Sequence, residues 1–211
     1  HLFRAQRQIV DAELPGPEEK LALLGVAVER LTAAGYQYIG LDHFALPDDP
    51  LAVAQRAGQL HRNFMGYTTH ADTDLIGLGV SAISHVDNTY SQTPRDLPEW
   101  EAAVDAGLPT VWRGMELGAD DMLRAEVIQA LMCHGQLDMQ AFADEHQLDF
   151  NTYFADDLQR LQALCADGLA FNDGRCIGAT SAGRPLLRLL AMCFDRYLHQ
   201  DAGAQRYSRA I

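Results

Sequence analysis

The sequence predicts an α+β fold, with the tail of a partial (β/α) barrel at residues 1–46 and a mostly helical, winged-helix-like domain at residues 47–211. Three observations predict it. A helical pattern, a glycine and a short strand follow one another near the start; a proline-rich break follows them; and helical patterns after residue 120 surround one hairpin signal. Within the second domain we expect a small sheet at residues 66–117 and the winged-helix-like part at residues 120–200.

The first unit begins with a polar, amphipathic stretch at residues 1–13, which we interpret as the end of a helix. Pro17, followed by two glutamates, then predicts a helix start, and apolar residues recur at helical spacing until Gly35 ends the pattern. A strand at residues 36–41 runs into Asp42 and His43. One helix–strand unit cannot close a barrel, so we expect the other strands upstream of His1 and interpret the chain as a fragment.

The segment Pro47-Asp48-Asp49-Pro50 marks the predicted domain boundary. After it, the patterns predict elements in the following order: a helix at 51–61, a turn at 66–69, a Gly- and Ser-rich strand at 75–84, a helix at 97–106 and a strand at 110–117. From residue 120 they predict helices at 121–133, 138–146 and 152–167, a hairpin around Asp173-Gly174, and a last helix at 182–199.

The charge of the chain bears on its partners. The formal net charge is −13, from 29 acidic and 16 basic residues, and a field of that sign repels phosphate backbones. The helix predicted at 152–167 has Asp156, Asp157 and Asp167 against Arg160, so a DNA-reading winged helix is disfavoured. We expect no nucleic-acid partner, and an acidic ligand would have to be held by local arginines. The sequence contains no apolar run long enough for a membrane span, so no membrane partner is expected.

The cysteines indicate a reduced, cytoplasmic protein. Cys133, Cys165, Cys176 and Cys193 form no Cys-x-x-Cys pair. A metal site is disfavoured at a group of polar residues that lacks a helical His-x-x-x-His pair, namely Asp42, His43, His61, His70, Asp72 and Asp74. We therefore expect no metal. Asp42 and His43 follow a barrel strand at its carboxyl end, and we predict that they line the mouth of an active site. An equally favoured alternative is that His43 is a structural histidine held by hydrogen bonds.

Residues 61–84 contain the most distinctive pattern. Gly66, Gly77 and Gly79 permit close backbone approach to a ligand, and the run Tyr67-Thr68-Thr69 supplies hydroxyls. Arg62 and, further on, Arg113 can pair with carboxylates through two parallel hydrogen bonds. The residues alone favour the alternative, in which the glycines serve turns and both arginines are solvated.

Several blocks resemble the oxygen-independent coproporphyrinogen III oxidases (dehydrogenases), a radical-SAM family. These blocks are Tyr-x-x-Ile-Gly-Leu-Asp-His-Phe-Ala (36–45), Arg-Asn-Phe-x-Gly-Tyr-Thr-Thr (62–69), Asp-Leu-x-Gly-x-Gly-Val-Ser-Ala-Ile-Ser (74–84), Trp-Arg-Gly (112–114), Met-Cys-Phe-Asp-Arg-Tyr-Leu (192–198) and Tyr-Ser-Arg-Ala-Ile (207–211). The resemblance runs in order from Phe3 to the last residue, which makes chance agreement implausible.

The resemblance implies a carboxy-terminal part of an enzyme that converts coproporphyrinogen III to protoporphyrinogen IX by oxidative decarboxylation of two propionates. In this family a 4Fe-4S cluster on Cys-x-x-x-Cys-x-x-Cys cleaves S-adenosylmethionine, and the resulting radical abstracts a propionate hydrogen. This chain lacks that motif. We therefore expect no catalytic residue and no cluster here, inactivity of the chain alone, and two partners: the tetrapyrrole substrate and the missing amino-terminal barrel.

Two positions of the resemblance imply a site for a second S-adenosylmethionine, namely Met65 and Ile83, with Phe64 and Gly66 beside them. Met65 stands where a family member has glutamine, and a thioether donates no hydrogen bond. The candidates for substrate binding are Arg62, Tyr67, Thr68, Asp42 and His43.

One alternative comes from a related branch of radical-SAM proteins that carry haem. On that hypothesis the chain would bind haem or another tetrapyrrole, and the candidate axial ligands would be His43, His61, His70 and His85. The Gly-Tyr-Thr-Thr block favours the oxidase branch.

Overall fold

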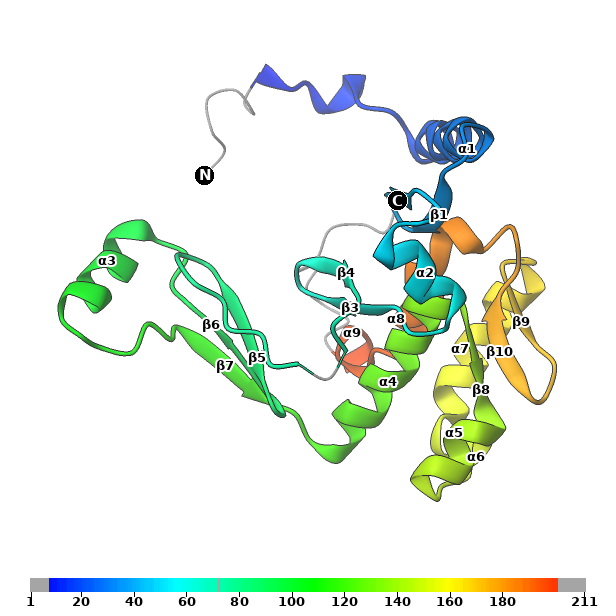
Figure 1. Ribbon diagram of the computed structural model, residues 1–211. Helices are drawn as coiled ribbons and strands as arrows, with labels where there is room; N and C mark the ends of the chain where they lie inside the picture. The colour runs from blue at the N-terminus through cyan, green and yellow to red at the C-terminus, as the bar shows by residue number, and fades with distance from the viewer. Residues whose placement is uncertain (1–7, 72, 201–211) are drawn as a thin grey trace.

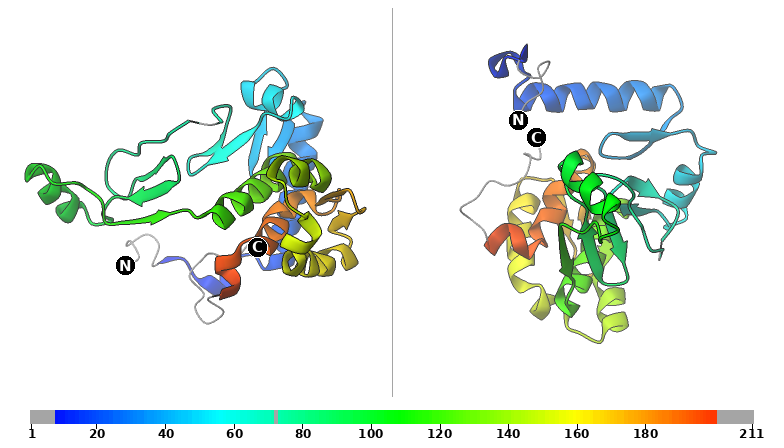
Figure 2. Two further views of the ribbon diagram at one scale, coloured as in Figure 1. Left: turned by 90° about the horizontal axis from the view of Figure 1, so that it is seen from below. Right: turned by 90° about the vertical axis from the view of Figure 1, so that its left-hand side faces the viewer.

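The computed structural model describes residues 8–71 and 73–200. Its first part contains a short 3-10 helix, η2 (Asp11–Glu13), where the sequence predicted the end of a longer helix. Helix α1 (Pro17–Ala33) begins at its proline and ends before Gly35, whose φ of +92° few other residues adopt. No residue of α1 is buried, and Leu21, Leu23 and Val26 are exposed. Figure 2 shows α1 running apart from the helical body of the molecule.

The strand predicted after α1 forms, but in a hairpin. β1 (Gln37–Gly40) pairs antiparallel with β2 (His43–Ala45), and Tyr38 lies opposite Phe44. No strand was predicted at the residues of β2; the left-handed backbone of Leu41, φ +54°, turns the chain back on itself there. The side chain of Ile39, a residue of β1, is fully buried.

Helix α2 (Pro50–Arg56) is shorter than the predicted 51–61. Its start is capped by the Asp49 carboxylate, which accepts a hydrogen bond from the Leu51 amide at 2.8 Å. Gly58, with φ +69°, takes the chain out of the helix. The freed residues enter a second hairpin, β3 (His61–Asn63) with β4 (Gly66–Thr68), so the turn predicted at 66–69 lies at 64–65 instead.

A three-stranded sheet projects from the molecule (Figure 1), and we call residues 83–117 the arm. β5 (Ile83–Val86), β6 (Thr89–Gln92) and β7 (Arg113–Glu116) pair antiparallel in the order β5-β6-β7. Helix α3 (Leu97–Asp105) joins β6 to β7 at the far end, close to its predicted place. β6 was not predicted.

The strand predicted at 75–84 is largely wrong. Only Leu75 forms a bridge there, with His85, and regular pairing begins at Ile83. The backbone between them cannot stay extended, because Gly79 and Ser81 adopt φ values of +100° and +60°. The Gly- and Ser-rich composition that suggested a strand therefore produces a loop.

The helical part follows the predicted order. Its elements are α4 (Ala119–His134), β8 (Gln136–Asp138), α5 (Met139–His146), α6 (Phe150–Tyr153), α7 (Ala155–Ala166), β9 (Ala170–Asn172), β10 (Cys176–Ala179), η3 (Arg184–Leu186), α8 (Leu187–Cys193) and α9 (Arg196–Gln200). The hairpin β9–β10 turns at Gly174, φ +87°, and gains an unpredicted third strand, β8. Helices with a three-stranded wing fit the predicted winged-helix-like arrangement.

Two predicted helices are broken in the structure. The helix predicted at 152–167 is divided at Phe154, which ends α6 and precedes α7. The helix predicted at 182–199 consists of η3, α8 and α9. The break after α8 coincides with the carbonyl of Phe194, which accepts a hydrogen bond from Arg124 at 3.1 Å. The carbonyl at the end of the helix is thus bound by Arg124, a side chain from a distant part of the sequence. Helical periodicity in the sequence does not reveal such a contact.

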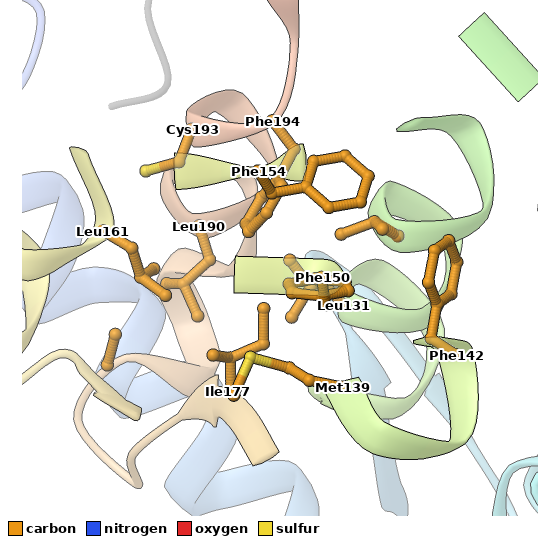
Figure 3. Packing of buried hydrophobic residues seen from close by; sticks show 12 residues of the cluster. Leu131, Met139, Phe142, Phe150, Phe154, Leu161, Ile177, Leu190, Cys193 and Phe194 are labelled. Atoms are coloured by element: carbon orange, nitrogen blue, oxygen red, sulfur yellow. The ribbon is translucent and has the colours of Figure 1, made fainter. Parts of the chain in front are cut away.

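The main core lies between α4, α5, α6, α7, α8 and the wing. Figure 3 shows its aromatic part, in which Phe142, Phe150, Phe154 and Phe194 pack edge to face or tilted. A second cluster beneath β1, α2 and β4 contains Ile39, Leu60, Tyr67 and Cys133. Because Cys133 belongs to α4, that helix contributes to both clusters and ties the two amino-terminal hairpins to the helical body.

None of the helices in the described part of the chain is both long and apolar enough to cross a membrane.

Candidate functional site

The tip of the β3–β4 hairpin presents two apolar side chains to solvent. Phe64 is 56% exposed and Met65 84%. Asn63 accepts a hydrogen bond from the Met65 amide at 2.8 Å, which holds the two-residue turn, and Gly66 follows with φ +129°. Two adjacent apolar side chains on a turn, both exposed, offer a contact surface for a ligand or a partner.

The base of this hairpin is anchored through Tyr67. Its ring is buried, and its hydroxyl donates a hydrogen bond to the carbonyl of Met132 on α4 at 3.1 Å. A side chain at Gly40 would overlap that hydroxyl, so a glycine is needed there. Burial raises the pKa of Tyr67 to about 12, which keeps the hydroxyl protonated as a donor.

Arg62 pairs with Tyr67 across the hairpin. Its guanidinium lies 5.8 Å from the centre of the Tyr67 ring, and its carbonyl accepts a hydrogen bond from Gln129 of α4 at 3.1 Å. Its Nε atom is buried and has no hydrogen-bond partner among the described residues. Two strands of the hairpin are therefore attached to α4, and the tip projects beyond the attachment.

Asp42 and His43 lie beside the same hairpin. The His43 ring meets the Tyr67 ring edge-on at 5.1 Å, and Gly66 lies against His43 Nε2. His43 Nδ1 is 2.8 Å from an Asp42 carboxylate oxygen, an ion-pair distance without hydrogen-bond geometry. The Asp42 side chain is 87% exposed. Four candidates from the sequence, Asp42, His43, Gly66 and Tyr67, are thus neighbours.

Thr68 also has a local partner, because its hydroxyl accepts a hydrogen bond from the His70 amide at 3.1 Å. Asp72, one of the residues of the disfavoured metal site, lies outside the described residues. Among the described residues, no group of three or more His, Cys, Asp or Glu side chains is arranged to hold a metal ion.

Ile83 lies on one face of the arm. Directly opposed residues of an antiparallel sheet share a face, so Ile83, Gln92 and Arg113 form one row and His85, Tyr90 and Met115 the next. We call this side the Ile83 face. Phe64 meets the Tyr90 ring edge-on at 5.2 Å, so the hairpin tip touches this face. A side chain at Gly77 would lie 2.6 Å from the Ile83 carbonyl oxygen, so the loop before the arm packs tightly there.

The sequence did not single out Tyr90 or Gln92, which link these parts of the site. Tyr90 stacks on His85 at 4.1 Å as well as contacting Phe64, and buried Gln92 binds Arg113 and the Ser81 carbonyl. Alternate residues of a strand share a face, so Tyr90 and Gln92 could have been grouped with Ile83 if the sequence had predicted β6. It did not, and the two residues were therefore missed.

The fold matches the carboxy-terminal part of a radical-SAM protein. Residues 117–186 match the family model described as the HemN C-terminal domain. The structure is similar to one described as coproporphyrinogen III oxidase from Escherichia coli, a radical SAM enzyme, with a TM-score of 0.87, 49% identity, and coverage of 93% of this chain and 45% of that chain.

Two curated relatives agree with this match. An oxygen-independent coproporphyrinogen III oxidase of Salmonella typhimurium is 50% identical over 100% of this chain, and one of Pseudomonas aeruginosa is 47% identical over 99%. The chain belongs to the oxygen-independent coproporphyrinogen III oxidase family and corresponds to the carboxy-terminal portion of its members, as the sequence predicted. It spans about half of the relatives' own length, 46% and 45%.

Proposed function

We propose that this chain is the covering, ligand-contacting portion of an enzyme that oxidatively decarboxylates two propionates of coproporphyrinogen III to give protoporphyrinogen IX. The observation that carries the proposal is a 50% identical match over the whole chain to a relative of that name. The exposed hairpin tip against the Ile83 face supplies a surface on which such an enzyme can hold its ligands. The whole enzyme acts in the cytoplasm, in keeping with four cysteines that are all free.

The cysteines of this chain do not fit an iron–sulfur cluster. The family's cluster is held by the closely spaced thiolates of a Cys-x-x-x-Cys-x-x-Cys motif, whereas Cys133, Cys165, Cys176 and Cys193 are far apart in the sequence and form no such motif. We assign the cluster, and with it the cleavage chemistry, to the upstream part that the relatives have in addition.

Residues at the hairpin tip and the Ile83 face would hold a second S-adenosylmethionine, beside the one whose cleavage supplies the hydrogen-abstracting chemistry and which we assign to the upstream part. Phe64 and Met65 offer an exposed apolar contact, Gly66 leaves the backbone accessible, and the Ile83 backbone lies close to Gly77. Met65 contributes packing only, because a thioether donates no hydrogen bond.

The candidates for substrate binding divide into two groups. Tyr67 and Arg62 are engaged with α4 and with each other, so we propose that they position the hairpin. Asp42, His43 and Thr68 lie at its rim. The ring of His43 adjoins Tyr67, and the Asp42 carboxylate faces solvent, where it can meet the tetrapyrrole or the upstream barrel.

The haem-binding alternative receives no support from His85, whose ring is stacked on Tyr90 and whose Nε2 atom is buried. An axial ligand needs an accessible ring nitrogen. Nucleic acid is disfavoured as a partner by the net charge of −13.

The test compares this chain with the longest native polypeptide that contains it. Both are prepared without oxygen, supplied with iron, sulfide, S-adenosylmethionine, an electron donor and coproporphyrinogen III, and assayed for protoporphyrinogen IX. We expect product only from the longer polypeptide. Product from the 211-residue chain alone, or none from a longer polypeptide that has acquired its cluster, would contradict the proposal. In the active form, Phe64→Ala should lower the affinity for S-adenosylmethionine, whereas Tyr36→Ala, distant from the hairpin tip in sequence, should not.

A further inference from the structure

Two arginines flank a tryptophan on the arm. The guanidinium carbons of Arg95 and Arg113 lie 5.3 Å and 4.9 Å from the centre of the Trp112 ring, which is 48% exposed. Neither arginine forms an ion pair with any carboxylate in the described part of the chain. The net charge of the chain is −13, so carboxylates outnumber cationic side chains in it. Two arginines that none of the described carboxylates pairs with lie on one exposed aromatic ring, and they form a surface suited to an anionic ligand.

Arg113 is held in a fixed orientation. Its Nε donates a hydrogen bond to the side-chain oxygen of Gln92 at 2.9 Å, and the Gln92 amide nitrogen donates to the Ser81 carbonyl at 3.1 Å. Gln92 is only 9% exposed, so it is a rigid support. The two terminal amino groups of Arg113 have no acceptor among the described residues. A guanidinium held by its Nε thus presents its terminal edge, whose two parallel donors match a carboxylate.

The position of Arg113 connects it to the proposed ligand site. Gln92 stands between Ile83 and Arg113 in the same row of the sheet, so Arg113 lies on the Ile83 face. The next row contains Tyr90, which Phe64 contacts. Arg62, the other arginine that the sequence suggested for carboxylates, is instead packed over Tyr67 with a buried Nε.

We propose that Arg113, assisted by Arg95 and Trp112, is a carboxylate-binding site of the arm that takes a propionate of the tetrapyrrole substrate. The inference rests on the proposed function, because that function supplies the tetrapyrrole. S-Adenosylmethionine also has a carboxylate, so the experiment must separate the two sources.

The experiment titrates the longest native polypeptide that contains this chain with coproporphyrin III, a stable tetrapyrrole with four propionates, and with its tetramethyl ester. Quenching of tryptophan fluorescence reports binding. We expect Arg113→Gln to weaken coproporphyrin binding by about 10- to 100-fold, the range of a hydrogen-bonded ion pair, and Arg95→Gln to weaken it less. Arg113→Lys should restore only part of the affinity, because an ammonium lacks the two parallel donors. Arg188→Gln removes the same charge from an exposed position on α8 and is the matched control.

Each outcome decides the inference. A weaker Arg113→Gln complex, with the ester insensitive to the substitution and the affinity for S-adenosylmethionine unchanged, supports it. Equal binding of acid and ester by the wild type, equal affinity of wild type and Arg113→Gln, or loss of affinity for S-adenosylmethionine alone overturns the assignment to a propionate. Retained coproporphyrin binding without any decarboxylation would count against the proposed function and leave this site standing.

Discussion

At the scale of single residues, Tyr67 shows how a motif with an expected ligand role serves the architecture. The sequence placed it in a hydroxyl-rich run beside glycines, and that pattern predicted ligand contacts. In the structure its hydroxyl crosses to the carbonyl of Met132 and fits against Gly40. The partners are 65 and 27 positions away in the chain, so no local pattern reveals them.

The contact between Gly40 and Tyr67 can be tested with a double-mutant cycle. Gly40→Ala should destabilise the fold by about 1–3 kcal/mol through overlap with the hydroxyl, and Tyr67→Phe by about 1 kcal/mol through the lost hydrogen bond. The double mutant should be less destabilised than the sum, by about 1 kcal/mol, because removing the hydroxyl relieves the overlap. Urea unfolding measures all three. Gly35→Ala, at another positive φ but in open space, is the control; additive effects would show that the two residues do not touch.

Alkaline pH should destabilise the chain through Cys133 and Tyr67. Burial raises the pKa of each to about 12, from ordinary values of 9.0 and 10.0. A group with a raised folded-state pKa stabilises the fold fully below its unfolded pKa, and that stability is lost as pH rises from about 9 toward about 12. In Cys133→Ala the free energy of unfolding should therefore fall less steeply above pH 9, by up to about 1.4 kcal/mol per pH unit. Val127→Ala, buried on the same helix without an ionisable group, should keep the wild-type slope.

At the scale of elements, local chemistry predicted those helices that have strong start and stop signals. Pro17 and Gly35 bound α1, and Asp-Gly turns the wing hairpin as expected. The misplaced elements depend on partners elsewhere. β2 and β8 are short and become strands through pairing with β1 and β10, and α8 ends where Arg124 takes the Phe194 carbonyl.

The carboxy-terminal helices are fastened to α4 and α7 by a buried ion cluster. Asp157 is 2% exposed and accepts hydrogen bonds from Arg124 and Arg160, both at 2.9 Å. These arginines also donate to the carbonyls of Phe194 and Cys193. The cluster therefore satisfies two carbonyl groups at the end of α8. The helical pattern of the sequence alone does not predict where this helix ends.

Asp157→Ala should destabilise the fold by about 1–3 kcal/mol, because Arg124 and Arg160 lose their shared carboxylate while Arg124 keeps its hydrogen bonds to Asp120. Thermal or urea unfolding provides the measurement. Its neighbour Asp156 is exposed, and Asp156→Ala should change stability by about 0.5 kcal/mol or less. Equal effects at the two positions would show that the cluster contributes nothing beyond surface charge.

The loop before the arm offers a test of the Ile83 face. Gly77→Ala would bring a side chain to 2.6 Å from the Ile83 carbonyl oxygen and must move that backbone. In the longest native polypeptide we expect binding of S-adenosylmethionine to weaken by about fivefold or more, roughly 1 kcal/mol, and the melting temperature to fall as well, because the overlap is with backbone atoms. Gly16→Ala, in open space, should leave binding unchanged. Calorimetric titration gives the comparison, and unaltered binding by Gly77→Ala would remove Ile83 from the proposed site.

At the scale of the whole molecule, the elements differ in how far they are packed. The helical part has a continuous aromatic core (Figure 3), whereas α1 and α3 contain no buried residue. Leu21, Leu23 and Val26 of α1 face outward, and relatives are about twice as long as this chain, which covers 46% of one of them. From these observations we propose that the upstream residues, which the relatives have in addition, pack on α1. The sequence predicted the order and type of most elements, but it could not show which would lack a core, because burial depends on all of them together.

Hydrogen exchange separates a helix that needs a partner from one that is stable by itself. A 17-residue helix without buried contacts is marginal in water, so the α1 amides should exchange rapidly in this chain. In the longest native polypeptide we expect them to exchange about 10- to 100-fold more slowly, because the upstream part covers the exposed leucines and valine. Peptides from the buried part of α4 should exchange equally slowly in both forms and serve as the internal reference. If α1 exchanges at the same rate in the two polypeptides, the upstream part does not pack on this helix, and its apolar side chains need another explanation.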